Sequence, residues 1–131
     1  GVLTKGDLIS AFPFPNTLVM TKITGAQIEG LFNHAAGMTN GVLQVSKSFR
    51  YIINPNGEIK ELKLKGKPID KEKTYWVAST NFVTLGGDGY WEFTESIEYE
   101  DTNIFIVDVV EEYLKDKPRY TPVYENRIVL E

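Results

Sequence analysis

The sequence predicts a mixed domain of the α/β (α+β) class, with a mixed, largely antiparallel sheet and flanking helices. Three observations predict this class. Apolar residues recur at helical spacing in segments that open on capping residues, as at Thr24. Short β-rich segments lie between these helices, separated by turn signals such as NPNG at 54–57. The length of 131 residues fits one domain, which we expect to span 1–131.

The first elements are a helix, a loop and a strand. Thr4 is followed three residues later by Asp7, a spacing that predicts a capping box and a helix start. Two prolines in the FPFPN segment at 12–16 forbid a helix and predict an extended or turning loop. The β-rich TLVMTKI segment at 17–23 then predicts a strand.

A second capping box, formed by Thr24 and Gln27, predicts a helix that runs to about residue 36. Gly37 is a natural stop for this helix. After it, residues 42–53 predict two short strand-like pieces around SKS at 46–48.

The middle of the chain predicts further strands. The alternation of EIKELKLK at 58–65 predicts a strand whose phase slips once, and the charged stretch 58–73 is expected to be a solvated hairpin. TYWVAST at 74–80 predicts a buried strand. It leads into a polar, glycine-rich loop at 81–90.

The last part of the chain predicts one helix and one strand. Thr102-Asn103 are good caps for an apolar-faced helix over 104–117, which Pro118 would end. We expect this helix to pack into the core rather than to present a partner surface. RIVL at 127–130 predicts a closing strand.

Composition excludes several classes of function. A net charge of −4 argues against binding nucleic-acid polymers, which needs a basic face. No apolar run reaches the ~20 residues that cross a bilayer. Without cysteine and with His34 as the one histidine, the chain lacks the ligands for a His-rich metal site, and no Ser-His-Asp set with a nucleophile elbow is apparent. We therefore expect neither a catalytic residue nor a metal ligand here.

The loop at 81–90 has the composition of a ligand-binding turn. Three glycines within 86–89 let the backbone approach a ligand, and Asp88 between them can accept hydrogen bonds from hydroxyl groups. Phe82 and Tyr90 flank the turn with aromatic faces. The spacing is not that of a phosphate-binding loop. The alternative is a tight turn with a capping Asp88.

A second candidate is the proline-rich loop that begins at Phe12. Prolines rigidify a loop, so an exposed aromatic residue within it loses little entropy when it binds a flat ligand. The alternative is that the phenylalanines of this loop belong to the core. Trp76 and Trp91 are expected to be core residues, and His34 a partly buried or surface histidine without a ligand role.

These segments, in this order, resemble the C-terminal domain of the 5'-nucleotidase family over nearly the whole chain. The matching segments are FPFxNTL at 12–18, TGAQI at 24–28, LQVS at 43–46, NFxxxGGDGY at 81–90 and RI at 127–128. The segment NFxxxGGDGY at 81–90 is the most specific of the set. The resemblance implies that family's C-terminal-domain fold.

The resemblance also implies site residues. In the family, two phenylalanine rings sandwich the nucleoside base, and the matching positions here are Phe14 and Phe82. The aspartate of the glycine turn contacts the ribose hydroxyls, which matches Asp88. The residues expected to shape the loop around these contacts are Asn81, Gly86 and Gly87.

Family members pair this domain with an N-terminal metallophosphoesterase domain that holds two divalent metal ions. The resemblance therefore implies a hydrolase of nucleoside 5'-phosphates, with the metal-bearing domain in cis and outside this chain. The isolated chain would be inactive. It also implies an extracellular, periplasmic or cell-surface protein that acts in nucleotide catabolism.

Two alternatives stay open. The domain could belong to a 2',3'-cyclic nucleotide phosphodiesterase or to a nucleotide-sugar or dinucleotide hydrolase of the same architecture. It could instead be a non-catalytic surface binding module. The exposure of Phe14 and Phe82 separates the second alternative from the nucleoside-binding hypothesis, because sealed rings cannot stack on a ligand.

Overall fold

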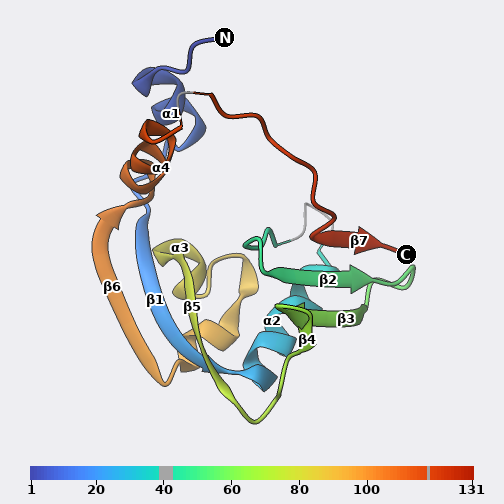
Figure 1. The fold of residues 1–131 in the computed structure, drawn as a ribbon. Helices are drawn as coiled ribbons and strands as arrows, with labels where there is room; N and C mark the ends of the chain where they lie inside the picture. Colours follow the sequence, from blue (N-terminus) through green and yellow to red (C-terminus); the bar gives the residue numbers. More distant parts are fainter. Residues whose placement is uncertain (39–42, 118) are drawn as a thin grey trace.

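Helix α2 lies between two small β-sheets in the computed structural model, which describes residues 1–38, 43–117 and 119–131 (Figure 1). The helices are α1 Lys5–Ala11, α2 Gly25–Ala36, α3 Asn81–Thr84 and α4 Ile106–Lys115, with short 3-10 turns η1 Gly87–Gly89 and η2 Trp91–Glu95. The strands are β1 Thr17–Thr24, β2 Phe49–Ile53, β3 Ile59–Leu64, β4 Lys67–Pro68, β5 Thr74–Thr80, β6 Glu98–Phe105 and β7 Ile128–Leu130.

The first sheet has the strand order β5-β1-β6 and is antiparallel throughout. The second has the order β4-β3-β2-β7, in which only the β2–β7 pair is parallel. The predicted mixed, largely antiparallel class with flanking helices is therefore confirmed. The strands form two sheets rather than one because α2 has apolar residues to bury against both β1 and the β2–β3 hairpin.

Local sequence signals set the helix starts. Thr24 accepts a hydrogen bond from the Gln27 amide at 3.1 Å, and the Gln27 side chain accepts one from the Thr24 amide at 2.8 Å. The same reciprocal pair joins Thr4 and Asp7 at the start of α1. These bonds from the Thr4 backbone and side chain hold the pKa of the Asp7 carboxyl below its usual range. Both predicted capping boxes are confirmed, and Gly37 ends α2 as expected.

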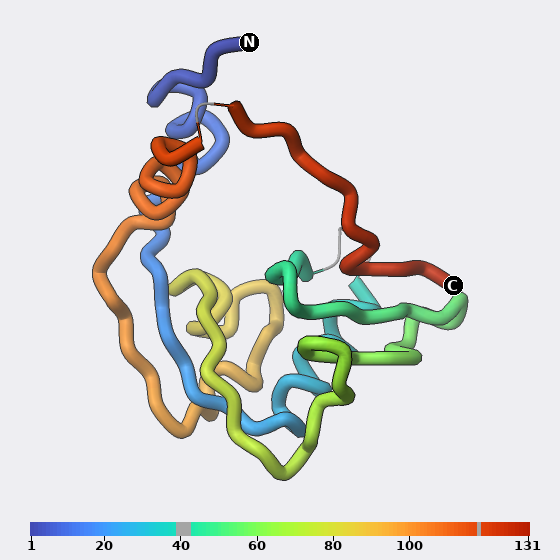
Figure 2. Tube along the Cα trace, in the orientation of Figure 1, coloured from blue at the N-terminus to red at the C-terminus, as the bar shows by residue number. Residues whose placement is uncertain are grey.

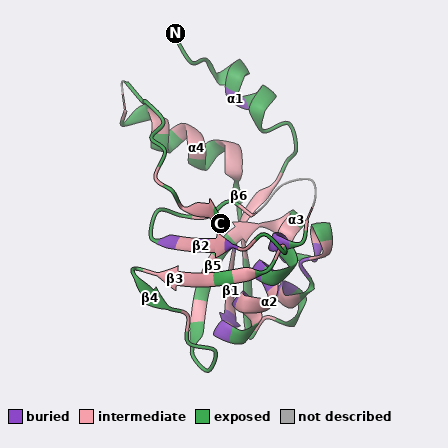
Figure 3. Ribbon diagram, turned by 90° about the vertical axis from the view of Figure 1, so that its right-hand side faces the viewer, coloured by how far each residue is buried: buried purple, intermediate pink, exposed green. Residues whose placement is uncertain are grey.

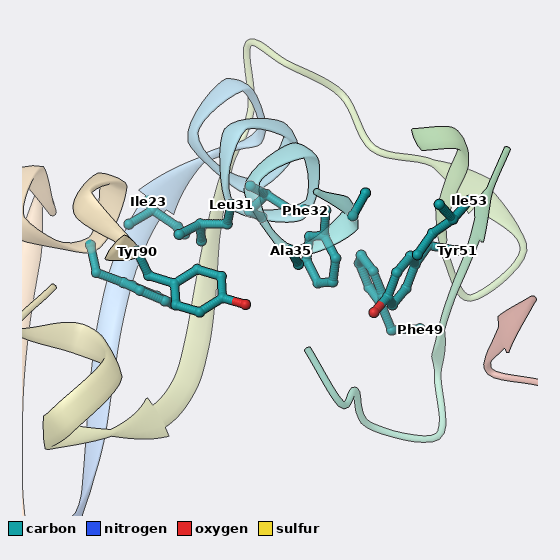
Figure 4. Close-up of a cluster of buried hydrophobic side chains, with 11 residues drawn as sticks. Ile23, Leu31, Phe32, Ala35, Phe49, Tyr51, Ile53 and Tyr90 are labelled. Carbon is teal, nitrogen blue, oxygen red and sulfur yellow. The ribbon is translucent and has the colours of Figure 1, made fainter. Parts of the chain in front are cut away.

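The core is centred on α2. Its Leu31 and Phe32 contribute to a cluster that extends from Ile23 on β1 to Phe49 and Tyr51 on β2 (Figure 4). The Phe32 ring stacks on Phe49 with centroids 4.8 Å apart. Figure 3 shows most of the buried positions gathered around α2, β1 and β2. This core fixes α2 against the first sheet, and so fixes the side chains that α2 directs toward the glycine-rich loop.

The predicted helix over 104–117 is wrong at its start. Residues 98–105 form β6, where Thr102 does not cap a helix but donates its hydroxyl to the Leu18 carbonyl at 2.6 Å. β-branched residues suit the sheet, and antiparallel pairing with β1 extends the strand to Phe105. The helix itself is Ile106–Lys115, and Pro118, its expected stop, lies outside the described residues.

The expected core packing of this last helix is also wrong. None of the residues of α4 is fully buried, and the helix packs against α1 at one end of the molecule (Figure 1). From there residues 119–127 follow an irregular path to β7, away from α1 and α4 (Figure 2). Amphipathic spacing reports an apolar face but not which element covers it.

Two strand expectations need correction. Within 42–53 the structure has one strand, β2, from Phe49; residues 43–48 form no strand, and residue 42 lies outside the described part of the chain. The strand at 74–80 is not buried but alternates between exposed and intermediate positions. It lies at the edge of the first sheet, so its outer face meets solvent. Trp76 on that face is 54% exposed, which contradicts its expected place in the core.

The hairpin at 58–73 fits its predicted solvated character. Its turn at 65–68 and residues 70–73 are exposed, and the side chains of Lys63 and Glu61 form an ion pair at 2.9 Å. The single slip in the alternation corresponds to a register shift, since Ile52 pairs with Glu61 whereas Ile53 pairs with Ile59. The predicted closing strand at 127–130 is confirmed as β7, Ile128–Leu130.

Candidate functional site

The candidate site lies at the end of the first sheet where β1 begins and β5 finishes. These strands are antiparallel, and Leu18 pairs with Thr80. The loop before β1 and the segment after β5 therefore leave the sheet at the same end of the strands. The end of β6 lies there as well, because Thr17 pairs with Phe105. The two candidate ligand-binding segments, in which Thr17 and Asn81 are 64 residues apart in sequence, are thus brought to one place by strand pairing (Figure 1).

Asn81 joins these two segments directly. It is the first residue of α3, and its side-chain carbonyl oxygen accepts a hydrogen bond from the Thr17 amide at 3.1 Å. Thr80 caps the same short helix by accepting a hydrogen bond from the Val83 amide at 3.3 Å. The proline-rich loop and α3 are consequently held together by a side chain that the sequence analysis singled out.

Both candidate stacking rings face solvent. Phe14 is 73% exposed and Phe82 is 51% exposed, so neither belongs to the core. Phe14 lies in a tight turn that is closed by a bond of 2.8 Å from the Asn16 amide to the Phe14 carbonyl. Phe82 lies one residue into α3. Two aromatic faces are therefore available on the segments that Asn81 ties together.

The glycine turn after α3 is packed closely against aromatic rings. A Cβ atom on Gly87 would lie 2.5 Å from the Phe82 carbonyl oxygen and 2.7 Å from its ring. On Gly86, which has φ +95°, a Cβ atom would lie 2.8 Å from the Trp91 indole. Trp91 is 67% exposed, so the expectation that it is a core residue is wrong. Larger residues at Gly86 or Gly87 would displace the rings that border the turn.

Asp88 lies at the tip of this turn in the left-handed region, with φ 56° and ψ 19°. A non-glycine residue there costs roughly 1–2 kcal/mol, so the surrounding contacts must hold it. Its side chain is exposed. The carboxylate is therefore presented to solvent and can accept hydrogen bonds from a ligand's hydroxyl groups.

His34 contacts the turn from α2, which the sequence analysis did not anticipate. Its Nε2 atom lies 2.6 Å from the Asp88 carbonyl oxygen. Its ring also meets Tyr90 edge to face, with centroids 4.9 Å apart. A single sequence carries no signal for this contact, since His34 and Asp88 are 54 residues apart.

Tyr90 connects the turn to the core. Burial raises the pKa of its hydroxyl, and the nearby Asp88 carboxylate raises this pKa further, because both disfavour a phenolate. The hydroxyl donates to the Met38 sulfur at 3.3 Å. Deeper in the core, burial and then Tyr90 raise the pKa of Tyr51 to about 12. The turn is therefore backed by neutral tyrosines at physiological pH.

The arrangement provides recognition chemistry: two exposed phenyl rings for a flat ligand and one exposed carboxylate for hydroxyl groups. Over the described ranges 1–38, 43–117 and 119–131, no group of three or more His, Cys, Asp or Glu is placed to hold a metal ion. No helix in the same ranges is long and apolar enough to cross a membrane.

Fold and candidate site together define a mixed α/β domain with exposed aromatic and acidic side chains at one end of its first sheet. A model of the 5'-nucleotidase C-terminal domain matches residues 1–95. The chain belongs to this family. The family resemblance carried by the sequence segments is thereby confirmed, together with the fold that it implies.

Relatives support the same assignment. The trifunctional nucleotide phosphoesterase protein YfkN of Bacillus subtilis is 33% identical over 98% of this chain and 10% of its own length. Protein UshA of Escherichia coli is 29% identical over 95% of this chain and 23% of its own. A 5'-nucleotidase precursor from Thermus thermophilus superposes with a TM-score of 0.88 at 30% identity, covering 98% of this chain and 28% of that one.

The chain spans only a part of these relatives, between 10% and 28% of their length.

Proposed function

We propose that this chain is the nucleoside-binding domain of a 5'-nucleotidase that hydrolyses nucleoside 5'-phosphates to nucleoside and phosphate. The base would stack between Phe14 and Phe82, and Asp88 would accept hydrogen bonds from the ribose hydroxyls. Asn81, Gly86 and Gly87 would shape the loop around the ligand. One observation carries the proposal: two exposed phenyl rings lie on segments joined by the Asn81–Thr17 bond, and Asp88 is exposed in the turn that follows Phe82.

The physical chemistry of the candidate site suits a nucleoside. Stacking on an aromatic side chain contributes about 1–3 kcal/mol per base and tolerates different bases. A hydrogen bond to a charged acceptor contributes about 1.5–3 kcal/mol. Association and side-chain ordering cost several kcal/mol, so these contributions do not simply add. We expect the chain alone to bind adenosine with a dissociation constant of about 1 mM, or roughly −4 kcal/mol.

Hydrolysis would take place on a separate domain. We propose that an N-terminal metallophosphoesterase domain in the same polypeptide holds two divalent metal ions that activate the attacking water. This chain would hold the nucleoside so that its phosphate points toward that domain, and alone it would be inactive. The snake venom 5'-nucleotidase of Naja atra, 26% identical over 98% of this chain, favours an extracellular, periplasmic or cell-surface location.

A nucleoside titration tests the proposal. Adenosine added to the ¹⁵N-labelled chain should shift the amides of Phe14, Phe82 and the 86–90 turn, and Phe14→Ala or Phe82→Ala should weaken binding by about fivefold or more. Trp76→Ala is the matched control, because Trp76 is as exposed as Phe82 but lies on the outer face of β5. An equal loss of adenosine affinity in all three variants, or no loss of affinity in any of them, contradicts the stacking site.

The role of Asp88 is tested separately with 2',3'-dideoxyadenosine, which keeps the base and lacks the 2'- and 3'-hydroxyl groups of the ribose. We expect wild type to bind this analogue more weakly than adenosine, by about tenfold for charge-assisted bonds. Asp88→Ala should bind both compounds with similar affinity. If Asp88→Ala still binds adenosine more tightly than the dideoxy analogue, Asp88 does not bind the ribose hydroxyls.

A second candidate is the same domain in an enzyme that acts on cyclic nucleotides, nucleotide sugars or dinucleotides. The name of YfkN, a trifunctional nucleotide phosphoesterase, favours keeping this candidate. Hydrolysis assays of the complete polypeptide on AMP, 2',3'-cyclic AMP, UDP-glucose and NAD separate the two. Turnover of AMP well above the others supports a 5'-nucleotidase, and the reverse order supports the second candidate. A non-catalytic surface module would hydrolyse none of these substrates.

A further inference from the structure

The tip of the glycine turn is held by a histidine from another element. His34 lies in the last turn of α2, the helix at the centre of the core, and its Nε2 atom lies 2.6 Å from the Asp88 carbonyl oxygen. A carbonyl oxygen only accepts hydrogen bonds, so His34 must donate the Nε2 proton. The bond therefore joins the rigid core to the residue with the least favourable backbone conformation in the turn.

The contact extends beyond this one bond. A Cβ atom on Gly89 would lie 2.9 Å from both Nε2 and Cε1 of His34, so the imidazole occupies the space that glycine leaves free. The edge-to-face contact with Tyr90 fixes the ring from a third side. Hydrogen bond, close packing and aromatic contact together determine the position of the Asp88–Gly89 peptide.

We propose that His34 is a positioning residue for the ligand-binding turn. By holding the Asp88 carbonyl, it keeps Asp88 in the left-handed conformation and so sets the direction in which the carboxylate meets the ribose hydroxyls. This inference rests on the proposed nucleoside-binding function and adds to it a residue outside the family segments described above. Without the bond, the peptide can rotate away from this costly conformation, and the carboxylate moves with it.

Two substitutions separate the hydrogen bond from the ring. His34→Phe keeps an aromatic ring against Tyr90 and removes the donor, whereas His34→Gln removes the ring and keeps an N–H donor of similar reach. In the ligand-free chain, His34→Phe should shift the carbonyl carbon of Asp88 and the amide of Gly89 strongly. His34→Gln should leave both near their wild-type positions. Equal shifts in the two variants would overturn the role of the hydrogen bond.

The second arm measures adenosine affinity by titration. We expect His34→Phe to raise the dissociation constant about fivefold, the worth of one hydrogen bond, and His34→Gln to recover most of that loss. In an Asp88→Ala background the two His34 variants should bind alike, because the carboxylate that His34 positions is gone. An undiminished effect of His34→Phe in that background would show that His34 acts on the ligand by another route.

Global stability and the proposed function are checked in the same samples. His34 is exposed, so urea midpoints of the two variants should lie close together. A large drop for His34→Phe alone would assign its effect to folding and overturn a positioning role. If wild type itself shows no response to adenosine, the proposed function fails, while the ligand-free spectra still decide whether His34 holds the turn.

Discussion

At the scale of single residues, the candidate site combines local chemistry with contacts between distant residues. The family resemblance of the sequence implied that Phe14 and Phe82 are the stacking residues, and both are exposed in the structure. Their exposure disfavours the alternative in which both rings are sealed in the core. What the pattern could not predict is the support behind Asp88, because the contact with His34 depends on where α2 packs.

Tyr51 provides a test of burial in the core through pH. Its folded pKa of about 12 lies above the usual value of 10.0, so the folded state keeps the proton that the unfolded chain releases. The contribution of Tyr51 to the free energy of unfolding should be constant below pH 10 and should fall as the pH rises toward 12. Urea unfolding at several alkaline pH values measures that slope.

Tyr51→Phe should make the alkaline slope shallower, although the raised pKa of Tyr90 contributes a slope of the same sign. Tyr124→Phe is the control, since the Tyr124 side chain is exposed and should leave the slope unchanged. An alkaline slope that is identical in wild type and Tyr51→Phe would mean that Tyr51 is not buried as described.

At the scale of helices and strands, the sequence predicts features that depend on neighbouring residues, but it does not predict which strands pair. The capping boxes at Thr4 and Thr24 involve residues three apart, and both form as predicted. The boundary between β6 and α4 could not be read from the sequence, because the apolar, β-branched residues around Ile104 suit either element. Pairing with β1 decides it, and that is a contact across some 88 residues.

The Thr24 capping box should contribute measurably to stability because it starts the helix on which the core is built. Thr24→Ala should lower the free energy of unfolding by about 1 kcal/mol, the usual cost of losing an N-cap. Thr24→Ser keeps the side-chain oxygen and should retain most of that stability. Urea unfolding of the three proteins measures the difference. A Thr24→Ala protein as stable as Thr24→Ser would show that the capping bond adds nothing.

Asn81 should control how firmly the proline-rich loop is tied to α3. Asn81→Ala removes the acceptor for the Thr17 amide, whose hydrogen exchange should become about fivefold faster for the loss of one bond. Asn81→Asp keeps an oxygen acceptor and should preserve the protection. Exchange of the Met20 amide, in the middle of β1, serves as the internal reference. Unchanged exchange at Thr17 in Asn81→Ala would rule out this link.

At the scale of the whole molecule, the fold places the candidate site at one end of the first sheet. The helix that contacts its glycine turn, α2, lies in the core. β1 and β5 bring the two aromatic segments together, while α2 connects the glycine turn to the second sheet. The class of fold was predictable from helix and strand periodicity. The division into two sheets was not, because periodicity shows that a segment has an apolar face without showing which partner covers it.

The most direct test of the nucleoside-binding site is a set of intermolecular NOEs between adenine protons and aromatic side chains in the adenosine-saturated chain. If the base stacks between Phe14 and Phe82, its H2 and H8 protons should give NOEs to both rings in the same complex and none to Trp76. NOEs to one of the two rings only, or to Trp76 instead, would contradict the aromatic sandwich.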